Sequence, residues 1–147
     1  IEAESPRSGE DPMTGMSVLV VEDDPINRKV MDLLLKGRMK LPEVTIFEDS
    51  REFLTRVSAL NPIPDIVLLD IHVEPHSGFE MIAMLRSLST YAAIPIVALT
   101  ASVMNDEVEH LRNSGFHSLI AKPVDLVTFP DVLNRILNGE RFWRVLD

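Results

Sequence analysis

Three adjacent carboxylates directly follow the apolar run VLVV (residues 18–21): Glu22, Asp23 and Asp24. The β-branched composition of this run predicts a strand that is buried on both faces. Two like charges about 4 Å apart repel each other by roughly 4 kcal/mol at an effective dielectric constant near 20. A cation, a helix N-terminus, solvent or protonation must offset this repulsion, so the strand end is a candidate site.

Polar side chains of complementary type follow three further apolar runs in the same way. Asp70, Thr100 and Lys122 each come directly after such a run. Because ligands of parallel sheets bind at the carboxyl ends of the strands, we expect these side chains to converge with Glu22 and Asp23. This convergence is stronger evidence for a site than any of the residues alone.

The residue types in this set could together support phosphoryl transfer. Glu22, Asp23 and Asp70 can hold a hard divalent cation such as Mg²⁺, which prefers oxygen ligands. One carboxylate in line with a phosphoryl group can act as a nucleophile and form an acyl phosphate. The hydroxyl group of Thr100 and the ammonium group of Lys122 can hold the remaining phosphoryl oxygens.

The elements that must position these residues alternate along the chain. Strands are predicted at 17–21, 43–48, 65–69, 95–99 and 117–121. Helices are predicted at 25–37, 51–60, 78–88, 103–113 and 126–137. This alternation predicts an α/β fold, a doubly wound five-stranded parallel sheet with helices on both faces. The second strand brings no polar residue to the site, which is typical of an edge strand.

Two prolines bear on how the predicted helices begin. Asp24-Pro25 fits an N-cap residue followed by proline at the first helical position. Pro130 would lie about one turn into the last helix, which would then start late or kink.

Size and composition limit the function classes. The chain has 147 residues, of which 46% are hydrophobic, enough for one domain with a sizeable core. The net charge of −9 argues against nucleic acid or an anionic membrane surface as a partner. There is no cysteine, which excludes disulfides and thiolate chemistry. No apolar run approaches the roughly 18 residues of a membrane span, and the cytoplasm is the expected compartment.

Four stretches of the region 16–138 carry a family resemblance: VLVVEDDPIN, DIVLLDIHVEPHSGFE, PIVALTA and GFHSLIAKPVD. With intervals of 30 residues from Asp70 to Thr100 and 22 from Thr100 to Lys122, this region resembles a response-regulator receiver domain of two-component signalling. The resemblance implies the (βα)5 receiver fold and a phosphorylation-dependent switch. Such a domain accepts a phosphoryl group from a phosphohistidine and dephosphorylates itself, and has no other enzymatic activity.

The resemblance also implies a Mg²⁺ site. Asp23 would be a direct ligand, Glu22 would act through water, and Asp70 would be both ligand and phosphoacceptor. The backbone carbonyl of His72 would complete the set. If the register differed by one residue, Asp23 and Asp24 would be the working pair, but Glu22 and Asp23 directly follow the strand.

Residues on the other strand ends receive phosphoryl-binding roles from the resemblance. Thr100 would hydrogen-bond the phosphoryl group and shift towards it, and Lys122 would pair with one of its oxygens. The Lys122-Pro123 peptide bond is expected to be cis. The small Ala101 implies open access for the phosphohistidine, and Gly78 matches a glycine eight residues after the phosphoacceptor.

The sequence departs from the family pattern in two places. Leu119 stands where the family usually has an aromatic residue, three positions before the lysine, so output would rely on another face. After the phosphoacceptor, the usual Met-Pro is replaced by Val73-Glu74, with Pro75 one position later. The segment 72–77 is therefore predicted to form a reshaped loop beside the site.

Three other functions fit parts of the pattern. A haloacid-dehalogenase-like phosphatase would need a second aspartate two residues after Asp70, where the chain has His72. A flavodoxin-like cofactor binder would need a Ser/Thr/Gly-rich loop in place of the acidic EDDPIN (residues 22–27). The remaining alternative is a pseudo-receiver that acts only as a protein-interaction module, although every catalytic position is filled.

The chain ends differ in composition from the domain between them. Residues 1–15 carry a net charge of −3 and are predicted to be a disordered tail or linker. Residues 139–147 form a C-terminal extension whose Phe142 and Trp143 could pack on the domain or on a partner. Expected partners are a sensor histidine kinase or histidine-phosphotransfer protein and a downstream effector. The domain would be a monomer or weak homodimer, either a stand-alone receiver or the terminal receiver of a hybrid kinase.

Overall fold

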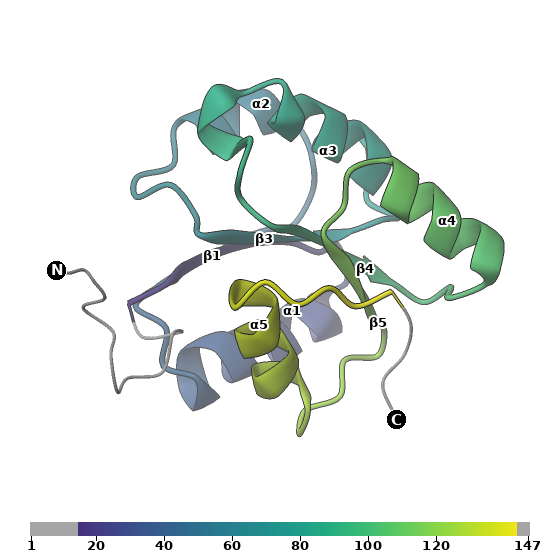
Figure 1. The fold of residues 1–147 in the computed structure, drawn as a ribbon. Helices are drawn as coiled ribbons and strands as arrows, with labels where there is room; N and C mark the ends of the chain where they lie inside the picture. The colour runs from purple at the N-terminus through teal and green to yellow at the C-terminus, as the bar shows by residue number, and fades with distance from the viewer. Residues whose placement is uncertain (1–14, 144–147) are drawn as a thin grey trace, which may run out of the picture.

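The computed structural model describes residues 15–143, so residues 1–14 of the predicted tail and 144–147 of the extension lie outside it. In this part of the chain, five parallel strands form one sheet in the order β2-β1-β3-β4-β5 (Figure 1). The strands are β1 (Ser17–Val21), β2 (Glu43–Phe47), β3 (Ile66–Asp70), β4 (Ile96–Thr100) and β5 (Ser118–Ala121). The predicted doubly wound sheet is confirmed, and β2 lies at an edge as predicted.

Helices cover both faces of this sheet (Figure 1). They are α1 (Pro25–Asp32), η1 (Leu33–Arg38), α2 (Phe53–Ser58), α3 (Gly78–Arg86), η2 (Ser89–Tyr91), α4 (Asn105–Asn113) and α5 (Phe129–Leu137). One face carries α1 and α5, and the other carries α2, α3 and α4. In the described residues, no helix is long and apolar enough to cross a membrane.

The first and last helices show how local sequence sets their bounds. Asp24 caps α1, with its Oδ1 accepting the N–H of Ile26 at 2.8 Å, which confirms the predicted cap. The predicted single helix 25–37 is divided, because α1 passes into the π-helical η1. In α5 the predicted late start is confirmed. The helix begins at Phe129, so Pro130 lies in the first turn, where its missing N–H costs nothing.

The central strands are apolar at nearly every position because both of their faces are covered. All residues of β1, β3 and β4 are buried. Successive side chains point to opposite faces, so Leu19 and Leu69 pack against the α2–α4 layer while Val20 and Leu68 pack against α1 and α5. The continuous apolar runs of the sequence reflect this two-sided burial.

After α5, the chain crosses the free edge of β5 as a segment that we call the C-terminal strap (residues 139–143). The N–H of Leu119 donates to the carbonyl of Phe142 at 2.7 Å, and the Phe142 N–H donates to Ser118 Oγ at 3.0 Å. Phe142 is buried in the α1–α5 side of the core, and Trp143 packs against the opposite side. Both aromatic residues therefore pack on the domain itself.

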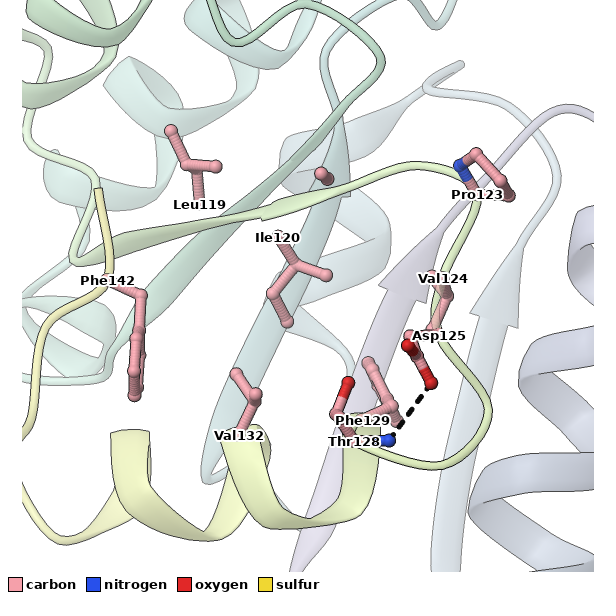
Figure 2. A pocket seen from close by; sticks show the side chains of 10 residues that line it. Leu119, Ile120, Pro123, Val124, Asp125, Thr128, Phe129, Val132 and Phe142 are labelled. Carbon is pink, nitrogen blue, oxygen red and sulfur yellow. Dashed lines mark hydrogen bonds between the residues drawn. The ribbon is translucent and has the colours of Figure 1, made fainter. Parts of the chain in front are cut away.

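A pocket of about 210 Å³ lies between β5 and the first turns of α5, beside the strap (Figure 2). Ile120, Val132 and Phe142 point into it. At its other end, Asp125 accepts the N–H of Thr128 at 3.2 Å. The sequence did not indicate this pocket, because only folding brings Phe142 to β5.

Candidate functional site

The carboxyl ends of four strands bring the predicted polar residues to one edge of the sheet. Asp70 and Thr100 are the last residues of β3 and β4, whereas the prediction placed them just beyond these strands. The reason is that strand pairing continues through them, with Asp70 opposite Leu99 and Thr100 opposite Ala121. Asp70 and Thr100 are thus held by the sheet itself, whereas Glu22, Asp23 and Lys122 lie just beyond the ends of β1 and β5.

Three carboxylates form a cluster at this edge. Glu22, Asp23 and Asp70 each offer an oxygen, and these atoms all lie within 4.8 Å of one another. Glu22 and Asp70 are only 1% and 2% exposed, whereas Asp23 is exposed to solvent. Asp24 instead directs its Oδ1 to the N-terminus of α1. These oxygen donors fit a hard divalent cation, so the cluster can bind a metal ion.

One ammonium group bridges the two buried carboxylates. Lys122 Nζ lies 3.0 Å from Asp70 Oδ2 and 3.3 Å from Glu22 Oε1. The Lys122-Pro123 peptide bond is cis, as expected. The positive charge of Lys122 therefore offsets part of the repulsion between the carboxylates.

Protonation of Glu22 offsets a further part of this repulsion. Burial, together with a hydrogen bond to Asp70 and the charge of that residue, raises the pKa of Glu22 to about 7. Burial also acts to raise the pKa of Asp70, but hydrogen bonds outweigh it and hold that pKa below its usual value; the partners are Glu22, the His72 N–H and Lys122. Burial opposes the charged form of Lys122, yet the two carboxylates raise its pKa. Below about pH 7, a protonated Glu22 therefore lies beside an Asp70–Lys122 ion pair.

The two remaining predicted residues have hydrogen bonds of their own. The Thr100 hydroxyl accepts the N–H of Ser102 at 3.0 Å and donates to its carbonyl at 3.2 Å. The backbone N–H of His72 donates to Asp70 Oδ1 at 3.0 Å, while the His72 side chain is exposed. Thr100 thus lies on the correct strand end with its hydroxyl turned towards its own loop.

One residue at this edge was not indicated by the sequence. Ser50, in the loop between β2 and α2, is fully buried and hydrogen-bonded to His76 in the loop after β3. A serine in a polar turn carries no signal in the sequence, and its partner is 26 residues away.

Gly78 leaves no room for a side chain next to the site. Its N–H donates to the carbonyl of Ile71 at 2.9 Å, and a Cβ added to it would lie 2.9 Å from the Cα of Ile71. Because Ile71 directly follows Asp70, we expect Gly78→Ala to displace the strand end and to lower the free energy of unfolding by about 1–3 kcal/mol. Urea denaturation measures this change.

Gly37 provides the matched control, because a Cβ added there meets nothing within 4 Å. Gly37→Ala should leave stability unchanged or raise it by up to about 1 kcal/mol. Equal losses in the two variants would contradict the steric explanation for Gly78.

Large apolar side chains are exposed in the segments that follow β1, β4 and β5. Ile26 of α1, Met104 before α4 and Val127 before α5 are 74%, 73% and 75% exposed. A hollow of about 180 Å³ opens between α1 and the loop after β5, with Glu22 and Lys122 in its lining. Large exposed apolar side chains in segments that follow the strand ends of the site are candidates for contact with a protein partner.

Comparisons with known proteins agree with this geometry. Residues 18–134 match the family of the response regulator receiver domain. The polar-differentiation response regulator DivK of Brucella anthropi is 27% identical over 129 residues, covering 82% of this chain and 95% of DivK. The chemotaxis response regulator CheY4 of Vibrio cholerae superposes with a TM-score of 0.74 at 25% identity, covering 82% of this chain and 98% of CheY4.

A third similar structure is the receiver domain of a kinase. The receiver domain of the sensor histidine kinase PA1611 from Pseudomonas aeruginosa PAO1, solved with a magnesium ion coordinated in its active site cleft, gives a TM-score of 0.74 at 24% identity. The match covers 85% of this chain and 99% of that domain. Since the family match spans most of its length, the chain belongs to the response regulator receiver domain family, the signalling module of two-component systems.

Proposed function

We propose that this domain is a phosphorylation-dependent switch in which Asp70 accepts a phosphoryl group from a phosphohistidine with the help of Mg²⁺. The observation that carries the proposal is the Asp70 carboxylate itself. It is buried, its pKa is held low against the effect of burial, and Lys122 lies 3.0 Å away. An ionised carboxylate beside a cation at the end of a strand is well placed to attack phosphorus.

The proposed direct ligands of Mg²⁺ are the carboxylates of Asp23 and Asp70 and the backbone carbonyl of His72, with Glu22 acting through water. When bound, Mg²⁺ supplies positive charge next to the phosphoryl oxygens. Three acidic side chains at this edge carry more negative charge than Lys122 alone can balance, which supports a metal ion here.

Transfer would proceed by in-line displacement. An Asp70 oxygen forms a bond to phosphorus while the bond from phosphorus to the donor's imidazole nitrogen breaks, and the electron pair leaves with that nitrogen. Lys122 would then pair with a phosphoryl oxygen. Thr100 would exchange its hydrogen bonds to Ser102 for one to the phosphoryl group. Attack of water on phosphorus later releases inorganic phosphate and restores the carboxylate, which is the autodephosphorylation step.

The proposed donor is a sensor histidine kinase or a histidine-phosphotransfer protein. The exposed Ile26, Met104 and Val127, which lie in segments following β1, β4 and β5, support docking of a protein that brings its phosphohistidine to Asp70. A downstream effector would read the phosphorylated form. A stand-alone receiver and the terminal receiver of a hybrid kinase both remain predictions, as does a cytoplasmic location.

The test is the intact mass of the protein after incubation with Mg²⁺ and acetyl phosphate. Wild type should gain one phosphoryl group, and Asp70→Asn should gain none. Asp24→Asn is the matched control, because asparagine also caps helices and the cluster does not include Asp24. This variant should be phosphorylated like wild type.

Other outcomes would reject specific parts of the proposal. Phosphorylation of Asp70→Asn would place the phosphoacceptor elsewhere. If no protein gains mass, also with phosphoramidate as donor, the pseudo-receiver that only binds partners becomes the better description.

A further inference from the structure

The β3–α3 loop (residues 71–77) follows the proposed phosphoacceptor directly and is fixed at its base. The Gly78 N–H closes it by donating to the carbonyl of Ile71 at 2.9 Å. Within the loop, Val73 is 2% exposed and packs in the core beneath α2 and α3. The chain just after Asp70 is therefore anchored at two points.

Ser50 provides a third anchor, from the neighbouring β2–α2 loop. Its hydroxyl donates to the carbonyl of His76 at 2.9 Å and accepts the His76 N–H at 2.6 Å. Its own N–H donates to the carbonyl of Glu74 at 3.3 Å. One fully buried serine thus makes three hydrogen bonds to the backbone on both sides of Pro75.

The turn that carries Ser50 is itself braced. Arg56 Nη1 donates to the carbonyl of Arg51 at 2.7 Å and to Asp49 Oδ1 at 3.0 Å, and its guanidinium lies 4.0 Å from the centre of the Phe47 ring. Asp49 also accepts a bond from Arg51 Nη2 at 2.8 Å. Ser50 therefore lies in a turn that several hydrogen bonds and a cation–π contact hold together.

We propose that Ser50 is a positioning residue for the Mg²⁺ and phosphoryl site. By holding Glu74 and His76, it fixes the path of the β3–α3 loop and so the position of His72, whose N–H binds Asp70 and whose carbonyl is the proposed metal ligand. The inference rests on the proposed function and assigns a part of the site that the sequence did not indicate. Replacing a residue that orients metal ligands without contacting the metal typically lowers metal affinity about 10–100-fold.

The test compares Mg²⁺ affinity in three variants by amide NMR titration. Ser50→Ala, which loses the hydroxyl, should bind Mg²⁺ roughly tenfold more weakly. Ser50→Thr keeps the hydroxyl and should recover most of this loss. Ser17→Ala is the matched control, because the Ser17 hydroxyl bonds to Ile63 and Asp65 at the opposite end of the sheet. It should bind Mg²⁺ like wild type.

A second measurement uses only the wild-type protein, so its result does not depend on whether a variant folds. The His76 amide should exchange slowly with solvent, because the Ser50 hydroxyl accepts its hydrogen. Fast exchange of the His76 amide would contradict the hydrogen bond from His76 to Ser50 and with it the positioning role of Ser50.

The outcomes separate this inference from the proposed function. If wild type binds Mg²⁺ and is phosphorylated but Ser50→Ala binds Mg²⁺ equally well, the positioning role is wrong and the proposed function stands. If Ser17→Ala weakens Mg²⁺ binding as much as Ser50→Ala does, a general loss of stability explains both, and the positioning role is again wrong. If wild type neither binds Mg²⁺ nor is phosphorylated, both proposals fail.

Discussion

Replacing Phe142 with alanine should lower the free energy of unfolding by about 3 kcal/mol. The ring is 7% exposed and packs with the core residues of α5, and its truncation removes these contacts. Buried Phe→Ala substitutions typically cost about 3–5 kcal/mol. The lower value applies because the pocket beside the ring lets its neighbours relax and admits water. Against a typical total stability of about 5–15 kcal/mol, this is a large fraction.

Chemical denaturation followed by circular dichroism measures this loss, and the strap offers its own control. Arg141 precedes Phe142 on the same segment but is exposed, so Arg141→Ala should change stability by less than about 0.5 kcal/mol. A loss below about 1 kcal/mol for Phe142→Ala would mean that the strap is not packed on the domain in solution.

Mg²⁺ binding should become roughly thirtyfold tighter when the pH is raised from about 5.5 to about 8. The reason is the pKa of Glu22, which burial and the neighbouring Asp70 raise to about 7. Below this pH, the carboxyl group carries a proton that Mg²⁺ must displace, so the apparent affinity falls by up to about tenfold for each further pH unit. Calorimetric titration at several pH values, with the released protons counted, measures this dependence.

Glu22→Gln separates the titration of Glu22 from that of the other carboxylates. This variant should bind Mg²⁺ more weakly at about pH 8, with an affinity that changes little between about pH 5.5 and 8. An unchanged dependence of Mg²⁺ affinity on pH in Glu22→Gln would assign the displaced proton to another group.

The raised pKa of Glu22 also affects folding stability, with the opposite sign. In metal-free protein, the contribution of Glu22 to the free energy of unfolding is fully present below its unfolded pKa and is lost as the pH rises through about 7.

The sheet and its strand ends could be predicted because they depend on local composition. The apolar runs ending at Val21 and Leu69 predict strands covered on both faces, and alternation with helices predicts that the strands are parallel. The roles of Thr100 and His72 stay predictions, because both roles depend on contacts to a phosphoryl group or a metal ion.

Features that depend on distant contacts could not be predicted. Ser50 meets His76 only after β2 and β3 have been placed in one sheet, and Phe142 meets Ser118 only after the chain has turned back from α5. The π-helical η1 was missed for another reason. The apolar period of 25–37 is compatible with one continuous helix, and a change in hydrogen-bond pattern leaves no trace in that period.

The strap also bears on how copies of this domain behave towards one another. A bare edge strand offers its backbone groups to any other strand and invites edge-to-edge aggregation. Here the carbonyl of Phe142 accepts the N–H of Leu119 and the N–H of Phe142 donates to Ser118 Oγ. The Phe142 ring covers apolar side chains beside β5. Loss of this segment would therefore do more than destabilise one molecule, because it would leave an open sheet edge beside the pocket, where a second copy could add its own strand.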